Sequence, residues 1–195
     1  ILLAVRGIGA LLGNIVVVWI NRIDPRIGLA LGFAAQAGSC LFLAQFDINM
    51  TTTDVAWASA IQGFGVGLAW VPLTIIMFSG IDSKDLPEGA SVLHLLRNIG
   101  SSIYISLTVT VIIRSTTTNY MDMSRAINPY NELLSFPGTM GRWDVGSVEG
   151  LARLSGEIER QASMIGYLNA FYLLAITGFV SIPIILLVRR HDRRS

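Results

Sequence analysis

Five long apolar stretches, separated by shorter polar connections, dominate the chain. They cover residues 2–20, 27–46, 55–79, 90–113 and 165–188. A bilayer core about 30 Å thick needs about 20 mostly apolar residues in a helix, and each stretch meets or nearly meets that length. The pattern therefore predicts five membrane-spanning segments.

The apolar stretches are rich in glycine and alanine and lack the strict alternation of a barrel strand. Because backbone groups in lipid must be hydrogen-bonded within the segment, the spans are expected to be helices. In the whole chain 52% of residues are apolar and 14% are charged, which is atypical of a soluble domain. We expect an all-α membrane protein, with residues 1–195 forming one transmembrane portion.

The chain begins with Ile1, inside an apolar run rather than at an initiator methionine. We therefore expect it to be part of a larger polytopic chain whose remainder lies upstream. The one cysteine, Cys40, falls within a span, so neither a disulfide framework nor a cysteine-based metal site is predicted.

Basic residues concentrate in one set of connections: NRIDPR at 21–26, GIDSKDLPEG at 80–89 and the tail RRHDRRS at 189–195. Cytoplasmic connections of membrane proteins carry an excess of Lys and Arg. This side, including the C-terminal tail, is therefore expected to face the cytoplasm, in a plasma (inner) membrane. The opposite side holds DINMTTTD at 47–54 and a long outer loop at 115–164.

The outer loop has two parts. Residues 115–141 are polar and contain prolines and glycines, as a surface loop would. Residues 143–160 place four apolar side chains at helical spacing: Val148, Leu151, Leu154 and Ile158. This second part predicts a short amphipathic helix that lies on the bundle or at the lipid headgroups.

A polar stripe runs along the fourth span. On a helical wheel six polar residues fall within an arc of roughly 120°, namely His94, Arg97, Asn98, Ser101, Tyr104 and Thr108. An arginine at the bilayer centre costs about 2.5 to 3.5 kcal/mol on insertion scales, so such a residue usually faces a cavity or the bundle interior.

A second interpretation of Arg97 stays open. Arg97 lies only about 10 Å below the cytoplasmic boundary, so its long side chain could reach the interface. Asn98 and Ser101 share the stripe and are too short to do so, which favours a cavity. His94 could relay protons near neutral pH, or it could be a satisfied interfacial group.

The third span contains features of helix packing and of binding. Gly63 and Gly67 are four residues apart, a spacing that lets a neighbouring helix approach closely, and Pro72 removes a backbone hydrogen bond, so the helix can bend. Gln62 needs a polar partner within the bundle. Trp70 offers an aromatic face for an apolar or cationic ligand, or simply packs against a neighbour.

Several ordered blocks resemble one transporter family. QGFGVGLAWVPLTIIMFSGI, DSKDLPEGAS and LLRNIGSSIYIS follow one another between residues 62 and 106. INRIDPR, INPYN and QASMIGYLNAFYLLA lie on either side of them. Together they closely resemble the C-terminal half of the EmrB/QacA drug:proton antiporters, the fourteen-span subgroup of the major facilitator superfamily.

The resemblance implies that the five spans are the last five of fourteen, within the C-terminal bundle, with a cytoplasmic C-terminus. It also implies export of amphipathic small molecules or drugs by proton antiport, with two bundles rocking about a central site. Related members handle fatty acids, siderophores or other metabolites. A periplasmic adaptor and an outer-membrane channel complete the route in Gram-negative relatives, and the outer loop would either dock the adaptor or act as a simple lid.

The resemblance also concerns individual residues. Asp24 and Arg26 would lie in the family's cytoplasmic turn, and the substrate-cavity candidates are Arg97, Asn98, Ser101, Gln62, Trp70, Tyr104 and Asn169. One departure concerns Asn169, because family members often have an acidic residue there and asparagine cannot bind and release a proton. None of the five stretches contains Asp or Glu, so the titrating carboxylates are expected upstream.

Other classes of function are less well supported by the sequence. HExxH, GxSxG and P-loop motifs and clustered carboxylates are missing, so we expect no enzyme, cofactor or metal site. The expected partners are a small-molecule substrate and the lipid bilayer, without nucleic acid. A channel or a non-transporting membrane scaffold remains the alternative.

Overall fold

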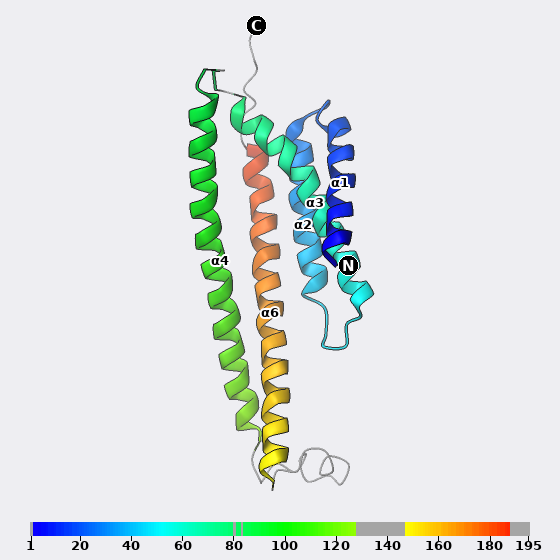
Figure 1. Ribbon diagram of the computed structural model, residues 1–195, viewed down its shortest axis with the longest axis vertical. Helices are drawn as coiled ribbons and strands as arrows, with labels where there is room; N and C mark the ends of the chain where they lie inside the picture. Colours follow the sequence, from blue (N-terminus) through cyan, green and yellow to red (C-terminus); the bar gives the residue numbers. More distant parts are fainter. Residues whose placement is uncertain (1, 80, 83, 128–146, 188–195) are drawn as a thin grey trace. The chain divides into compact units, whose positions relative to one another are not determined.

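The computed structural model describes residues 2–79, 81–82, 84–127 and 147–187. Within these ranges it contains five long helices: α1 (Leu2–Ile20), α2 (Pro25–Leu43), α3 (Thr52–Phe78), α4 (Leu86–Arg125) and α6 (Val148–Leu187) (Figure 1). All five are long and apolar enough to cross a membrane. The described part of the chain has no strand, and the predicted all-α membrane fold is confirmed.

The chain divides into two compact units. The first comprises Ile1–Ile105 and Phe171–Ser195, and the second comprises Ser106–Ala170. Helices α1, α2 and α3 therefore belong to the first unit. Helices α4 and α6 are each divided between the two units.

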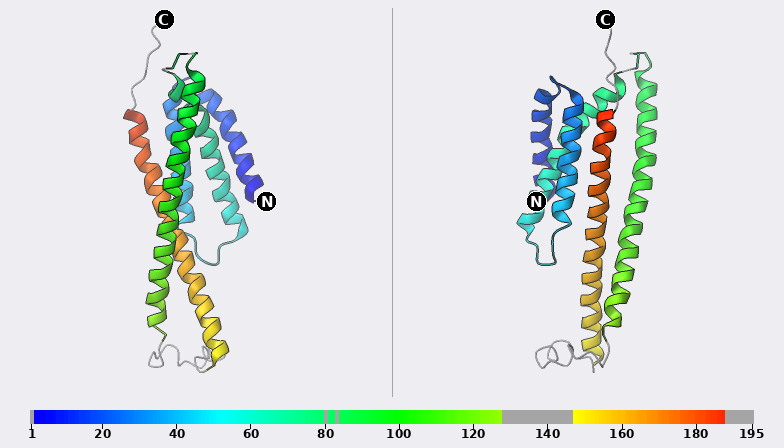
Figure 2. Two further views of the ribbon diagram at one scale, coloured as in Figure 1. Left: turned by 60° about the vertical axis from the view of Figure 1, so that its left-hand side comes forward. Right: turned by 180° about the vertical axis from the view of Figure 1, so that it is seen from behind.

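Glycines mediate the packing of α1 on α3, which lie side by side in both views of Figure 2. Each helix contributes two buried glycines spaced four residues apart, which are Gly9, Gly13, Gly63 and Gly67. A Cβ atom at Gly63 would overlap the Arg6 carbonyl oxygen, and one at Gly67 would overlap the Ala10 carbonyl oxygen. The two backbones therefore touch, as helices do where small residues repeat every fourth position.

Helix α2 packs against the opposite face of α3. Gly65 lies about 200° around α3 from Gly63, and a Cβ there would come 2.8 Å from the carbonyl oxygen of Gly32 on α2. The buried Ser39 hydroxyl donates a 2.7 Å hydrogen bond to the Ala58 carbonyl oxygen. Helix α3 is thus the central element of this three-helix group.

The turn between α1 and α2 is fixed by Asp24. Its backbone is extended, its carboxylate accepts a 3.0 Å hydrogen bond from the Arg26 amide, and Pro25 follows at the first helical position. An N-cap carboxylate followed by proline is a favoured helix start, because it satisfies an amide that has no partner within the helix. Asp24 therefore has a structural role in this turn.

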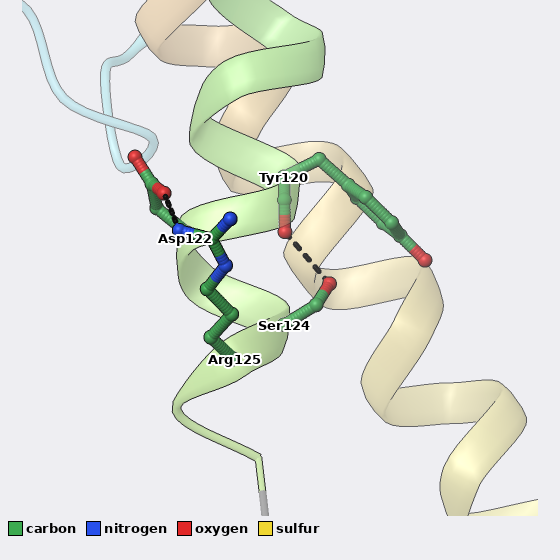
Figure 3. A network of polar contacts seen from close by, with 4 residues as sticks. All are labelled: Tyr120, Asp122, Ser124 and Arg125. Atoms are coloured by element: carbon green, nitrogen blue, oxygen red, sulfur yellow. Dashed lines mark hydrogen bonds and ion pairs between the residues drawn. The ribbon is translucent and has the colours of Figure 1, made fainter.

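Helix α4 continues beyond the expected span of 90–113. The residues after Ile113 were expected to form an outer loop, yet the helix reaches Arg125. Polar side chains in this part bond within the helix, for example the Ser124 hydroxyl to the Tyr120 carbonyl oxygen at 2.7 Å (Figure 3). A span predicted from apolar residues ends where polarity rises, whereas a helix can continue in the polar region.

Helix α6 likewise differs from the expectation of a separate short helix at 143–160. Its residues 148–160 are the first turns of a helix of 40 residues that runs to Leu187. Glu149 and Arg153 form an exposed 2.7 Å ion pair at i,i+4 in this part. At 1.5 Å per residue α6 measures about 60 Å, about twice the bilayer core, so it extends outside the lipid.

Some expected segments lie outside the described residues. They are the tail at 189–195, the middle of the outer loop at 128–146 with most of INPYN, and the first four positions of the 143–160 segment.

Candidate functional site

Arg97 and Trp70 meet in the first unit, between α3 and α4. The guanidinium carbon of Arg97 lies 4.7 Å from the centroid of the Trp70 ring. A guanidinium over an indole is attracted by the negative face of the ring and keeps its charge at any physiological pH. Trp70 is still 46% exposed, so much of its surface remains available to a ligand.

A pocket of about 200 Å³, hereafter the Arg97 pocket, adjoins this pair. Apolar and aromatic side chains form most of its lining, including Leu73, Met77 and Phe78 of α3. His94 and Arg97 supply the basic groups from α4, and no carboxylate occurs among the described residues that line it. The arrangement suits a molecule with an apolar body and an acidic or hydrogen-bonding head.

Gln62 and Tyr104 lie in a different pocket of the first unit, of about 300 Å³, hereafter the neutral cavity. Its polar lining comes from four helices and comprises Gln36, Cys40, Gln62, Tyr104, Thr177 and Ser181. The Tyr104 hydroxyl is hydrogen-bonded to the Thr177 hydroxyl. This bond connects α4 to α6 at the wall of the cavity.

Sequence spacing explains why the two pockets are separate. Trp70 and Gln62 are eight residues apart on α3, which is about 12 Å along the helix axis. Arg97 and Tyr104 are seven residues apart on one face of α4, which is about 10.5 Å. The short connection between α3 and α4 makes the two helices run in opposite directions. Arg97 is therefore level with Trp70, and Tyr104 with Gln62.

Asn98 and Ser101 line neither pocket. Both are exposed, and the Ser101 hydroxyl donates a 3.0 Å hydrogen bond to the Asn98 carbonyl oxygen of its own helix. The neighbouring helices cover only part of the polar stripe on α4. His94 and Arg97 therefore line the Arg97 pocket, Tyr104 lines the neutral cavity, and Asn98 and Ser101 stay exposed.

Asn169 lies in the second unit, whereas the other substrate-cavity candidates belong to the first. Its amide nitrogen donates a 2.6 Å hydrogen bond to the Ser115 hydroxyl, which joins α6 to α4. Nearby, a Cβ atom at Gly166 would come 3.0 Å from the Ile112 carbonyl oxygen, so the two helices approach closely there. In this arrangement Asn169 connects two helices.

The third-span candidates for packing and bending are all buried. Gly63 and Gly67 form the contact with α1, and Pro72 is fully buried within a continuous α3. Two residues after Pro72, the Thr74 hydroxyl donates to the carbonyl oxygens of Val71 at 2.8 Å and Trp70 at 3.2 Å. These bonds go to carbonyl oxygens of the preceding turn and do not replace the hydrogen bond that Pro72 removes.

Sequence reasoning missed four polar residues of the neutral cavity: Gln36, Cys40, Thr177 and Ser181. A signal was present, since glutamine inside an apolar span is costly unless it faces a polar environment. Thr177 and Ser181 are four residues apart and so share one helix face. Within the described residues, no group of three or more His, Cys, Asp or Glu side chains could hold a metal ion.

Comparisons with known proteins identify relatives that match most of the chain. The chain is 29% identical over 167 residues to the multidrug export protein EmrB of Haemophilus influenzae, covering 85% of this chain and 32% of the relative. It is 25% identical to the probable multidrug resistance protein EmrY of Escherichia coli, over 85% of this chain and 32% of the relative. It is 24% identical to the fatty acid resistance protein FarB of Neisseria gonorrhoeae, over 87% of this chain and 34% of the relative.

The chain thus spans about a third of the length of these relatives. No family model matches it, and no solved structure does. The relatives match most of the chain, and the described residues hold five helices that could cross a membrane. The predicted family resemblance is confirmed, and this chain is a multi-pass membrane protein related to the EmrB-type transporters.

Proposed function

We propose that this chain forms the C-terminal part of an exporter of amphipathic small molecules, and that the Arg97 pocket contributes to substrate binding. The observation that carries the proposal is the Arg97 guanidinium 4.7 Å from the Trp70 ring, beside an apolar pocket. Apolar lining with a few placed polar groups is the usual composition of a small-molecule site. The names of the relatives, which refer to multidrug export and fatty acid resistance, support the same class of function.

The charge of the pocket favours amphipathic acids among these substrates. Arg97 is a permanent cation, and the described lining includes no carboxylate to balance it. A carboxylate would gain a charge-assisted hydrogen bond at Arg97, whereas a quaternary ammonium would be repelled. A fatty-acid-like molecule is therefore a second candidate substrate, beside the drugs that the names of the multidrug relatives suggest.

We further propose that export is coupled to protons and proceeds by alternating access in the plasma (inner) membrane, with the C-terminus in the cytoplasm. The distribution of basic residues supports this orientation. Because the apolar stretches contain no Asp or Glu, we expect the proton-binding carboxylates in the upstream part of the full-length protein.

The experiment is a flux assay with the full-length protein in proteoliposomes. We expect dodecanoate efflux to saturate with substrate concentration, to require an imposed pH gradient and to collapse when a protonophore is added. Empty liposomes are the control, since dodecanoic acid crosses bilayers unaided. Flux that rises linearly with concentration and ignores the protonophore would indicate a channel and contradict the proposal.

The start of α6 is proposed to dock a periplasmic adaptor protein. Residues 148–160 lie outside the length that a bilayer core can hold, and their charged side chains Glu149, Arg153 and Arg160 are exposed. Deleting residues 148–160 is expected to reduce adaptor capture by the full-length protein at least about tenfold, as removal of an interface does. Undiminished capture would rule this surface out.

A further inference from the structure

The neutral cavity differs from the Arg97 pocket in its chemistry. No charged side chain occurs among the described residues that line it. Its polar groups are two amides, three hydroxyls and one thiol, which lie beside the rings and methyl groups of Phe33, Ala37 and Leu174. Such a site in a low-dielectric bundle disfavours ions, because nothing there compensates the loss of their hydration.

The three hydroxyls are already engaged. Tyr104 and Thr177 are bonded to each other. Thr177 also reaches the carbonyl oxygens of its own helix, at 2.9 Å to Leu173, and the Ser181 hydroxyl donates a 2.8 Å hydrogen bond to the Thr177 carbonyl oxygen. These groups shape the wall of the cavity and have little capacity left for a ligand.

The two glutamines are different. Gln62 lies within hydrogen-bonding reach of the Cys40 thiol, a weak partner. The amide of Gln36 makes no hydrogen bond to any described residue, although its Cγ packs tightly at Gly65. Each amide offers two donors and one acceptor oxygen, and both side chains are part-buried at the wall of the cavity. The cavity therefore presents donors and acceptors that a bound molecule would satisfy.

We propose that the neutral cavity is a binding site for a small uncharged molecule that both donates and accepts hydrogen bonds, held by the Gln36 and Gln62 amides. A volume of about 300 Å³ lies at the lower end of the range for small-molecule sites. The site is separate from the Arg97 pocket in residues and in charge, so it stands whether or not that pocket binds substrate.

Cys40 provides a reporter for the site, because its thiol lines the cavity and is otherwise buried. The full-length protein in lipid nanodiscs would be treated with methyl methanethiosulfonate. The modification of Cys40 would be measured over time by peptide mass spectrometry, and the Cys40→Ser variant would assign the modified peptide. Three probes of similar size compete: benzamide is neutral with donors and an acceptor, benzoate is charged, and ethylbenzene is apolar. We expect benzamide to slow the modification and the other two to have little effect.

Two substitutions identify the groups that bind. Gln36→Leu and Gln62→Leu keep the side-chain size and remove the amide, and each is expected to raise the half-protecting concentration of benzamide about 3- to 10-fold. Gln45→Leu, an exposed glutamine just after α2, is the matched control and should leave it unchanged.

Three results would overturn the proposal. Complete resistance of Cys40 to the reagent would show a closed cavity. If benzamide does not protect Cys40 from modification, the neutral cavity holds only water. Equal protection in the parent and in both leucine variants would show binding elsewhere. The readout is thiol modification and not transport, so it is independent of the outcome for the proposed exporter.

Discussion

Replacing Gly63 by alanine is expected to destabilise the protein by about 3 kcal/mol, although alanine is the better helix former by about 1 kcal/mol. The reason is that a Cβ atom at Gly63 would overlap the Arg6 carbonyl oxygen of α1. Backbone cannot move aside as a flexible side chain can, so α1 and α3 would have to separate. The expected result is a lower thermal unfolding temperature of the purified full-length protein and loss of a monodisperse peak in detergent.

The matched control is Gly7→Ala on α1. A Cβ atom there would meet nothing within 4 Å, so intrinsic helix propensity alone should act and stability should stay level or rise. The pair separates the effect of the contact from that of propensity, because the substitution is chemically identical at both positions. If Gly63→Ala proved as stable as Gly7→Ala, the glycine contact between α1 and α3 would not exist in the membrane.

The existence of the five helices could be predicted because length and apolarity are local properties. Lipid leaves a 20-residue apolar segment essentially one way to satisfy its backbone. Their ends could not be predicted equally well. Residues after Ile113 are polar and were assigned to a loop, but the helix continues to Arg125, and the Ser124 hydroxyl bonds to the Tyr120 carbonyl oxygen one turn back. Polarity marks the limit of the bilayer and not the limit of the helix.

The candidate site was less predictable because pockets depend on which faces meet. A wheel of α4 groups Arg97 with Tyr104 correctly as one face, yet it cannot show that Trp70 lies opposite the first residue and Thr177 opposite the second. Gln36 was missed for the same reason, since its role depends on neighbours from other helices. Asn169 was grouped with the substrate candidates, whereas its amide bonds to Ser115.

The second prediction with a large effect is the substitution of Arg97, which tests whether the charge of the Arg97 pocket binds acidic substrates. We expect Arg97→Ala in the full-length protein to reduce kcat/KM for dodecanoate efflux at least about tenfold, because a hydrogen bond to a charged group contributes about 1.5 to 3 kcal/mol. Efflux of dodecyltrimethylammonium, which has a similar alkyl chain and the opposite charge, should be unchanged or improved. Arg97→Lys should restore part of the dodecanoate activity, since it keeps the charge but not the planar guanidinium.

A second Arg–Trp pair provides the control for this experiment. The Arg22 guanidinium carbon lies 5.9 Å from the centroid of the Trp19 ring, at the end of α1 and outside both pockets. Arg22→Ala removes the same charge from a similar aromatic partner and should leave transport of both probes unchanged. If Arg97→Ala behaved like Arg22→Ala, Arg97 would be an interfacial anchor whose side chain reaches the headgroups, and the acid-binding role would be wrong. A selective loss of dodecanoate transport would instead support a position of Arg97 near the substrate headgroup, because a nearby positive charge attracts a carboxylate and repels an ammonium.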